Sequence, residues 1–317
     1  MANEDFNCAD EAPEFIPMDE PNQTNQTKQK AQDKVQWLDL RAAVEHSRKE
    51  IDFVLPGLKQ GVVGALVATG GVGKTMIAVQ MCMTVASGYD MLKLESLGWQ
   101  CKTGKVVFLS AEDDLDILHN RINAMGAMLS PSNREAMYEN LRIASLVGLG
   151  ANVQEASWQA WFYEATKGAR LVVFDTLRRF HQLDENDNGA MANLIAWLEG
   201  ICKVNGITVI FLHHTNKASS GADVTQHASR GASVLTDNAR WQANLAVMSE
   251  KEAEATETDS ELRSWFVKLC FTKLNYSQPL PDVWLRKREG GALELAQFAT
   301  SSVTSKKKGG KREQASY

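Results

Sequence analysis

The sequence predicts an α/β fold, in which a mostly parallel central sheet is extended by antiparallel strands near the C-terminus. Apolar runs at 106–109, 171–174 and 207–212 lack polar alternation, which is typical of strands buried on both faces of a parallel sheet. Helical patterns alternate with these runs, as expected for α/β proteins. The last third alternates apolar and polar residues more clearly and has loops between its strands, which predicts the antiparallel extension.

The expected elements follow one another along most of the chain. In chain order they are strand 62–68, helix 75–87, strand 106–109, helix 115–129, strand 141–144, helix 155–167, strand 171–174, helix 190–204 and strand 207–212. Strands 241–248, 264–273 and 283–288 complete the prediction.

Charge is unevenly distributed over the 317 residues, whose formal net charge is −5. Residues 1–33 hold eight acids and two lysines without an apolar period, which predicts a disordered acidic arm. Residues 300–317 are expected to be a disordered basic tail, and 34–299 a single domain. The window 250–261, with six acids and one lysine, is interpreted as a surface loop between two strands. Because the acidity lies in these segments, the net charge does not exclude a nucleic-acid partner.

The five cysteines are widely spaced and form no C-x-x-C pair, so we expect reduced thiols. The N-terminus lacks the basic region and apolar core of a signal peptide, and no apolar run reaches ~18 residues. These features predict a cytoplasmic protein with no membrane partner.

A phosphate-binding loop is the strongest signal in the sequence. Between a strand and a helix, residues 68–75 read Ala-Thr-Gly-Gly-Val-Gly-Lys-Thr. This is a Walker A loop, with Ala68 in place of the usual first glycine. Backbone N–H groups of Gly70, Gly71, Val72 and Gly73 would face phosphate oxygens, Lys74 would reach the β and γ phosphates, and Thr75 would ligate Mg²⁺. The alternative is a glycine-rich turn without nucleotide.

Asp175 ends the apolar run 171–174, which is the pattern of a Walker B aspartate that supports the Mg²⁺ shell. Taken alone, an aspartate that caps a turn explains the pattern equally well. The preceding Walker A loop favours the metal role.

Glu112 follows the strand 106–109 at the strand end where α/β sheets place their ligands. It is a candidate general base toward water attacking the γ-phosphate. Alternatively, Glu112, Asp113 and Asp114 cap the next helix, a role that we assign to Asp113 or Asp114.

His213 and His214 follow the strand 207–212. One imidazole can sense the γ-phosphate while the other packs, since adjacent residues of an extended chain point to opposite faces. That geometry disfavours a metal pair, and a structural histidine remains the other alternative.

As a set, these motifs resemble RepA-type plasmid replicative helicases, over about residues 54–291. The matching segments are the Walker A loop, 111–113, 173–181, 211–214, 228–242 and 273–276, and the block 230–242 is the most specific of them. The resemblance implies a RecA-like P-loop ATPase that forms a ring-shaped homo-hexamer and unwinds DNA 5′→3′ during plasmid replication.

Carried over by position, the resemblance implies ATP and Mg²⁺ at the Walker motifs, Glu112 as catalytic base and His213 or His214 as sensor. Arg240 matches the arginine finger that the neighbouring subunit supplies; without the resemblance, an ordinary surface arginine would be preferred. Single-stranded DNA is expected to meet the loop 216–227 through Lys217, with Arg178 and Arg179 as alternative contributors. With no primase domain in the sequence, separate primase and initiator proteins are expected partners.

Two rival functions remain open at this stage. One is a RecA-fold DNA-binding ATPase switch that regulates replication or recombination without unwinding. The other is a small-molecule P-loop kinase, which the block 230–242 and the lack of a recognisable substrate lid disfavour.

Overall fold

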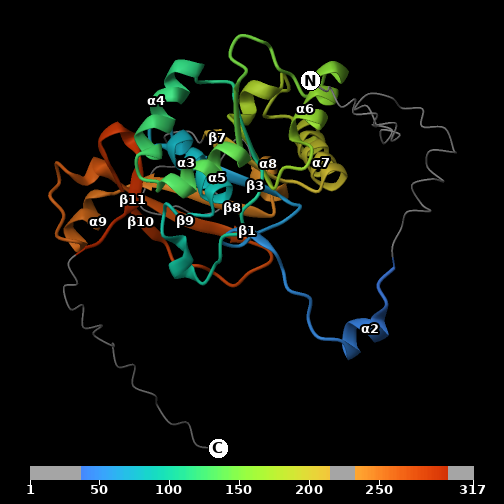
Figure 1. The fold of residues 1–317 in the computed structure, drawn as a ribbon, viewed down its shortest axis with the longest axis horizontal. Helices are drawn as coiled ribbons and strands as arrows, with labels where there is room; N and C mark the ends of the chain where they lie inside the picture. The colour runs from blue at the N-terminus through green and yellow to red at the C-terminus, as the bar shows by residue number, and fades with distance from the viewer. Residues whose placement is uncertain (1–36, 215–232, 299–317) are drawn as a thin grey trace, which may run out of the picture.

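A nine-stranded sheet forms the centre of the fold, in a computed structural model that describes residues 37–214 and 233–298 (Figure 1). Its strands are β3 (Val63–Ala68), β4 (Val106–Ser110), β5 (Leu141–Ser145), β6 (Leu171–Asp175), β7 (Thr208–His214), β8 (Trp241–Val247), β9 (Phe266–Leu274), β10 (Val283–Lys287) and β11 (Leu293–Leu295). The spatial order is β11-β10-β9-β8-β3-β7-β6-β4-β5. Strands from β5 to β8 pair in parallel and those from β8 to β11 antiparallel. The predicted fold class is therefore confirmed.

Helices cover both faces of the parallel part, which is why its strands show no polar alternation. On one face lie α3 (Lys74–Ser87), α4 (Leu115–Gly126) and α5 (Pro131–Asn140); on the other lie α6 (Ala156–Thr166), α7 (Asn188–Asn205) and α8 (Ser233–Asn238). Successive β6 residues alternate between two apolar cores: Leu171 and Val173 pack toward α3, Val172 and Phe174 toward α7. The carboxyl ends of β3, β4, β6 and β7 consequently share one edge of the sheet.

Local sequence signals set the helix ends. Asp114 caps α4 by accepting a hydrogen bond from the Ile117 amide at 2.9 Å, so the capping role falls to Asp114 and not to Glu112. Gly88 ends α3 with φ +73°, a left-handed conformation that favours glycine. At Gly64 the indole of Trp241 would lie 2.9 Å from an added Cβ, so only glycine allows β8 to pack this closely on β3.

The interpretation of 250–261 as a loop is wrong in its first half. Residues Glu250–Ala255 form helix α9, because Ser249 and Glu252 make a reciprocal capping box at its start. The Glu252 carboxylate also accepts a hydrogen bond from the Lys268 ammonium of β9. The acidic residues of this window are therefore partly used in structure.

Several short elements were not predicted. They are α2 (Leu40–Glu45), the hairpin β1 (Phe53–Leu55) and β2 (Leu58–Lys59), helices α5 and α8, strand β11, and the 3₁₀ turns Leu94–Leu97, Leu177–Phe180 (η2), Arg263–Trp265 and Glu289–Gly291. Within the described ranges, no helix is long and apolar enough to cross a membrane. The four cysteines in those ranges are free thiols. The expected arm 1–33, the tail 300–317 and Lys217 lie outside the described residues.

Candidate functional site

The candidate site lies where β3, β4, β6 and β7 end, at the carboxyl edge of the parallel sheet. The strands deliver the phosphate-binding loop, Glu112, Asp175 and the two histidines to this edge. The parallel register places Ala68 beside His214, and Ser110 beside Asp175. Side chains from four separate segments are thereby brought together, as the sequence predicted for ligands of an α/β sheet.

The loop between β3 and α3 has the backbone conformation of an anion site. Gly71 and Gly73 have φ of +77° and +114°, values that an L side chain rarely adopts. At Gly70, Gly71 and Gly73 an added Cβ would meet no described atom within 4 Å, so the space beside the loop is open to a ligand. Because α3 begins at Lys74, its positive N-terminal end points into that space.

Lys74 is buried, and its side chain folds back over the loop. Its ammonium lies 3.3 Å from the carbonyl oxygen of Ala68 and 3.4 Å from that of Thr69, and 2.9 Å from Nδ1 of His214. Burial lowers the pKa of Lys74 to about 8, although the negative charges of Asp175 and Glu112 act in the opposite direction. An incoming phosphate would supply the anionic partner that the two carbonyls replace only weakly.

Asp175 is fully buried, and neither carboxylate oxygen has a hydrogen-bond partner of good geometry among the described residues. Burial raises the pKa of Asp175 to about 7; the nearby Thr75 hydroxyl lowers it but lies outside hydrogen-bond geometry. Two orphaned carboxylate oxygens next to a hydroxyl fit a hydrated Mg²⁺, which prefers oxygen ligands and keeps several waters. Thr75 and Asp175 could hold this ion.

Glu112 lies just beyond β4 and is held by a neighbouring strand end. Its Oε1 accepts a hydrogen bond from the Thr176 hydroxyl at 3.0 Å and lies 3.7 Å from Nε2 of His214. The side chain is 31% exposed, so one carboxylate oxygen is fixed while water can reach the group. This arrangement suits a base that accepts a proton from water.

The two histidines point to opposite faces of β7, as the alternation of an extended chain requires. His213 continues the Val209 and Phe211 row and is buried; burial lowers its pKa to about 4. His214 faces α3, and for its Nδ1 to accept from the Lys74 ammonium the ring proton must be on Nε2, toward Glu112. The histidine that faces the phosphate-binding loop is thus His214.

Arg178 and Arg179 lie in η2, directly after β6, and both are exposed. Ring contacts between Phe180 and Phe174, with centroids 5.0 Å apart, fix this turn against the α7 face of the sheet. Arg178 donates to the His181 carbonyl at 3.2 Å and lies 3.6 Å from Glu185. Of the two, Arg179 is the one whose guanidinium makes no ion pair within the described ranges.

Arg240 does not join the other candidates. It precedes β8, and its amide donates to the Val63 carbonyl at 2.9 Å, at the start of β3. The phosphate-binding loop begins five residues further along β3, about 17 Å away at the rise of a strand. Arg240 is exposed, and its guanidinium has no hydrogen-bond or ion-pair partner among described residues. It cannot serve the nucleotide site of its own chain in this position.

The sequence interpretation assigned no role to Thr176 or to the carbonyls of Ala68 and Thr69, although they position Glu112 and Lys74. A hydroxyl directly after the Walker B aspartate was the one available signal. Backbone carbonyls carry no side-chain signal, so only the folded loop reveals their contact with Lys74.

Comparisons with known proteins agree with this site. A family described as "AAA domain" matches residues 26–220, which include all the candidates except Arg240. Among solved structures, an isolated ATPase domain superposes with a TM-score of 0.52 at 15% identity, covering 81% of this chain and 96% of its own. A KaiC-like protein from Pyrococcus horikoshii gives the same TM-score and identity, covering 78% of this chain and 100% of its own. At this identity the likeness shows the fold alone, which is RecA-like.

Proposed function

The chain belongs to the AAA domain family and is a RecA-like P-loop ATPase, and on that premise we propose that it is a DNA helicase of the RepA type. In this proposal a ring-shaped homo-hexamer hydrolyses ATP at its subunit interfaces and moves 5′→3′ along single-stranded DNA. It acts in plasmid replication in the cytoplasm, beside a separate primase and an initiator protein.

One observation carries the proposal: the chain holds most of a hydrolytic site at one edge of its sheet and an unpaired arginine at the other. Lys74, Glu112, Asp175 and His214 lie together, whereas Arg240 lies about 17 Å from their phosphate-binding loop. An arginine that stabilises charge on the transferred phosphoryl group contributes on the order of 10³–10⁵ in rate when a neighbouring molecule supplies it. A closed ring would place Arg240 of each subunit against the site of the next.

The described residues divide the chemistry of hydrolysis among them. Glu112 would take a proton from water as the water oxygen attacks the γ-phosphorus and the bond to the β–γ bridging oxygen breaks. Lys74 would leave the loop carbonyls for the β and γ phosphates. Mg²⁺ held by Thr75 and Asp175 would neutralise charge on the phosphate oxygens.

His214 would report on the γ-phosphate. Its Nδ1 is bound to Lys74, so movement of the ammonium to a phosphate frees this imidazole. The chain continues from His214 directly into 215–232, the segment that holds Lys217. We expect Lys217 to contact DNA, with Arg178 and Arg179 as further candidates, because clustered cations and local salt-dependent binding are typical of single-strand sites.

Two assays on the purified protein test this function. We expect ATP hydrolysis that single-stranded DNA stimulates, and ATP-dependent displacement of a strand annealed with a free 5′ tail on the loading strand. Lys74→Ala should abolish both, while the exposed Lys203→Ala should leave both intact. DNA-stimulated hydrolysis without displacement on either tail polarity would reject the helicase and favour the ATPase switch.

Assembly is tested separately by electron microscopy of the protein with and without nucleotide. Six-membered rings are expected. A monomer at all concentrations would reject both Arg240 as a finger and a central channel.

A further inference from the structure

Helix α2 stands away from the body of its own chain. None of its residues is buried, and Trp37, Leu38, Leu40 and Val44 are 73–90% exposed. Leu40 and Val44 are four residues apart and therefore share one face of the helix. An exposed apolar cluster of this kind is unusual on a soluble domain and marks an interaction surface.

The attachment of α2 explains this position. The segment after it is tied to the body only at Asp52, which accepts two hydrogen bonds from Arg170, each 2.8 Å long. Residues 46–51 are exposed, and fully extended they span about 20 Å. Figure 1 shows α2 carried away from the sheet, on the opposite side of the view from α4.

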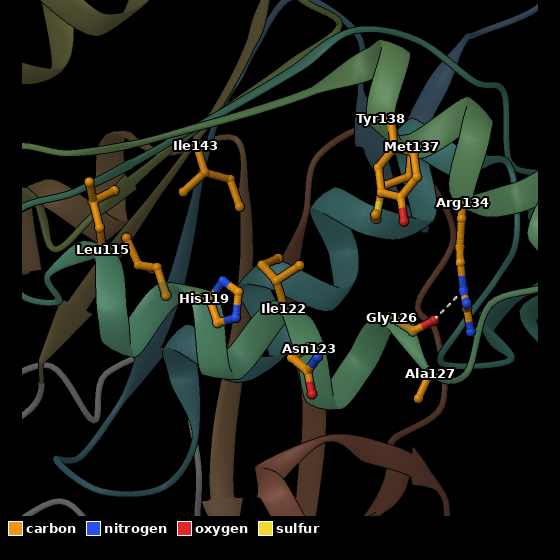
Figure 2. Close-up of a pocket in the computed structure, with 11 residues that line it drawn as sticks. Leu115, His119, Ile122, Asn123, Gly126, Ala127, Arg134, Met137, Tyr138 and Ile143 are labelled. Atoms are coloured by element: carbon orange, nitrogen blue, oxygen red, sulfur yellow. Dashed lines mark hydrogen bonds between the residues drawn. The ribbon is translucent and has the colours of Figure 1, made fainter.

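The body offers an unfilled apolar groove between α4 and α5, with a volume of about 520 Å³. Its apolar lining is Leu115, Leu118, Ile122, Met137, Tyr138 and Ile143. Figure 2 shows these side chains arriving from α4, α5 and β5. Leu115 and Tyr138 are 65% and 63% exposed at its rim, so the groove lacks a covering element in a single chain.

We propose that α2 of one copy docks in the α4–α5 groove of a neighbouring copy. The helix supplies four large apolar side chains, and the groove supplies an apolar floor from three elements. Charge agrees: Asp39 and Glu45 flank the apolar residues of α2, while His119 and Arg134 are the basic groups that line the groove. A second copy is the occupant because each chain presents both parts and the Asp52 anchor directs its own α2 to the far side.

This inference deepens the proposed assembly and rests on it only in requiring that two copies meet. It gives the ring a contact that is independent of nucleotide, since neither α2 nor the groove includes a residue of the phosphate site. Docking through a short linker would also hold neighbouring subunits together while their ATP sites open and close, because binding through a tether keeps the local concentration high.

Cysteine crosslinking tests the contact in the full-length chain. In a background with Cys8→Ser and Cys101→Ser, one tagged chain carries Leu40→Cys and a differently tagged chain carries Tyr138→Cys. Mild oxidation should give a heterodimer at least about tenfold more abundant than the control pair Leu40→Cys with Lys203→Cys, whose second site lies on the α7 face. A yield equal to that control would overturn the proposal.

A doubly substituted chain with Leu40→Cys and Tyr138→Cys, mixed with excess chain lacking both, separates the remaining alternative. Crosslinking within that chain would show that α2 occupies its own groove and would also overturn the proposal.

Assembly gives a second readout. Leu40→Asp with Val44→Asp should weaken self-association by about tenfold or more in sedimentation velocity, and Tyr138→Asp should do the same from the groove side. Arg41→Gln, on the same helix, should have no such effect. These positions are exposed, so the thermal unfolding midpoint should not change. Crosslinking without strand displacement would retain this contact and reject the helicase; displacement without crosslinking would do the reverse.

Discussion

The two edges of the parallel sheet use charged residues in different ways. At the amino edge, Arg170 donates two 2.8 Å hydrogen bonds to Asp52, and the Gly61 amide donates to the Thr208 hydroxyl. At the carboxyl edge, Asp175 has no hydrogen-bond partner of good geometry in the described ranges, and Lys74 has long contacts to two carbonyls. Charges at the first edge hold the chain together, whereas charges at the second remain available for a ligand. Folding stability and function are therefore expected to separate along the strand axis.

Arg240 is the exception to this comparison, because it lies at the amino edge without a partner among the residues that the structure describes. We expect Arg240→Ala to lower the rate of ATP hydrolysis by on the order of 10³-fold or more, without altering the thermal unfolding midpoint. Steady-state hydrolysis measured in mixtures with wild-type protein checks whether the arginine acts in trans. Activity should fall more steeply than the mutant fraction.

The exposed Arg142→Ala, on β5, is the matched control and should mix without effect. A linear fall with the fraction of Arg240→Ala would mean that each subunit works alone, and Arg240 would then belong with the structural residues of its edge.

Asp175→Asn should separate stability from activity at the carboxyl edge. The substitution keeps the side-chain shape but removes a buried charge whose oxygens lack partners in the described ranges, so the protein should become more stable by a few kcal/mol while Mg²⁺-dependent hydrolysis is lost. Denaturant unfolding at pH 8 and hydrolysis assays measure the two effects. Asp116→Asn, on the exposed face of α4, should change neither. A destabilised Asp175→Asn protein would show that the carboxylate is satisfied in the free chain.

The sequence predicted the parallel core well because its signals are local. Apolar strands buried on both faces, the glycine pattern of 68–75 and the capping residues each act within a few neighbours. It missed α5 and α9, whose helices depend on the caps Ser130 and Ser249 more than on apolar periodicity.

Of the site, the candidates were identifiable by their place after a strand. Which histidine faces Lys74 depends on the register of β7 against β3, and the isolation of Arg240 depends on the pairing of β8, neither of which is written in a local pattern.

Two buried histidines extend the comparison to acid conditions. His181 and His213 are both buried, and burial lowers the pKa of each to about 4, below the usual 6.5. Because the unfolded chain takes up protons near pH 6.5 and the folded chain resists until about pH 4, stability should fall as the pH drops through this window. The expected loss by pH 5 is about 1–2 kcal/mol for each histidine.

Urea unfolding between pH 8 and pH 4.5 measures this loss. His181→Asn removes one of the two groups and should reduce the pH dependence by about half, whereas the exposed His119→Asn should leave it unchanged. An unchanged pH dependence in His181→Asn would show that this imidazole is already protonated in the fold.

The smallest effect is expected at the paired amino edge. Arg170→Met should destabilise the chain by about 1–2 kcal/mol, since it removes a bidentate ion pair whose carboxylate is partly exposed and whose energy water therefore reduces. Hydrolysis per folded site should be unchanged, because Arg170 lies at the start of β6, at the opposite end from Asp175. A double-mutant cycle with Asp52→Asn should recover a coupling energy of similar size. Loss of hydrolysis in a folded Arg170→Met protein would break the division between the two edges; its loss only after dilution would instead indicate that the Asp52 anchor serves assembly through α2.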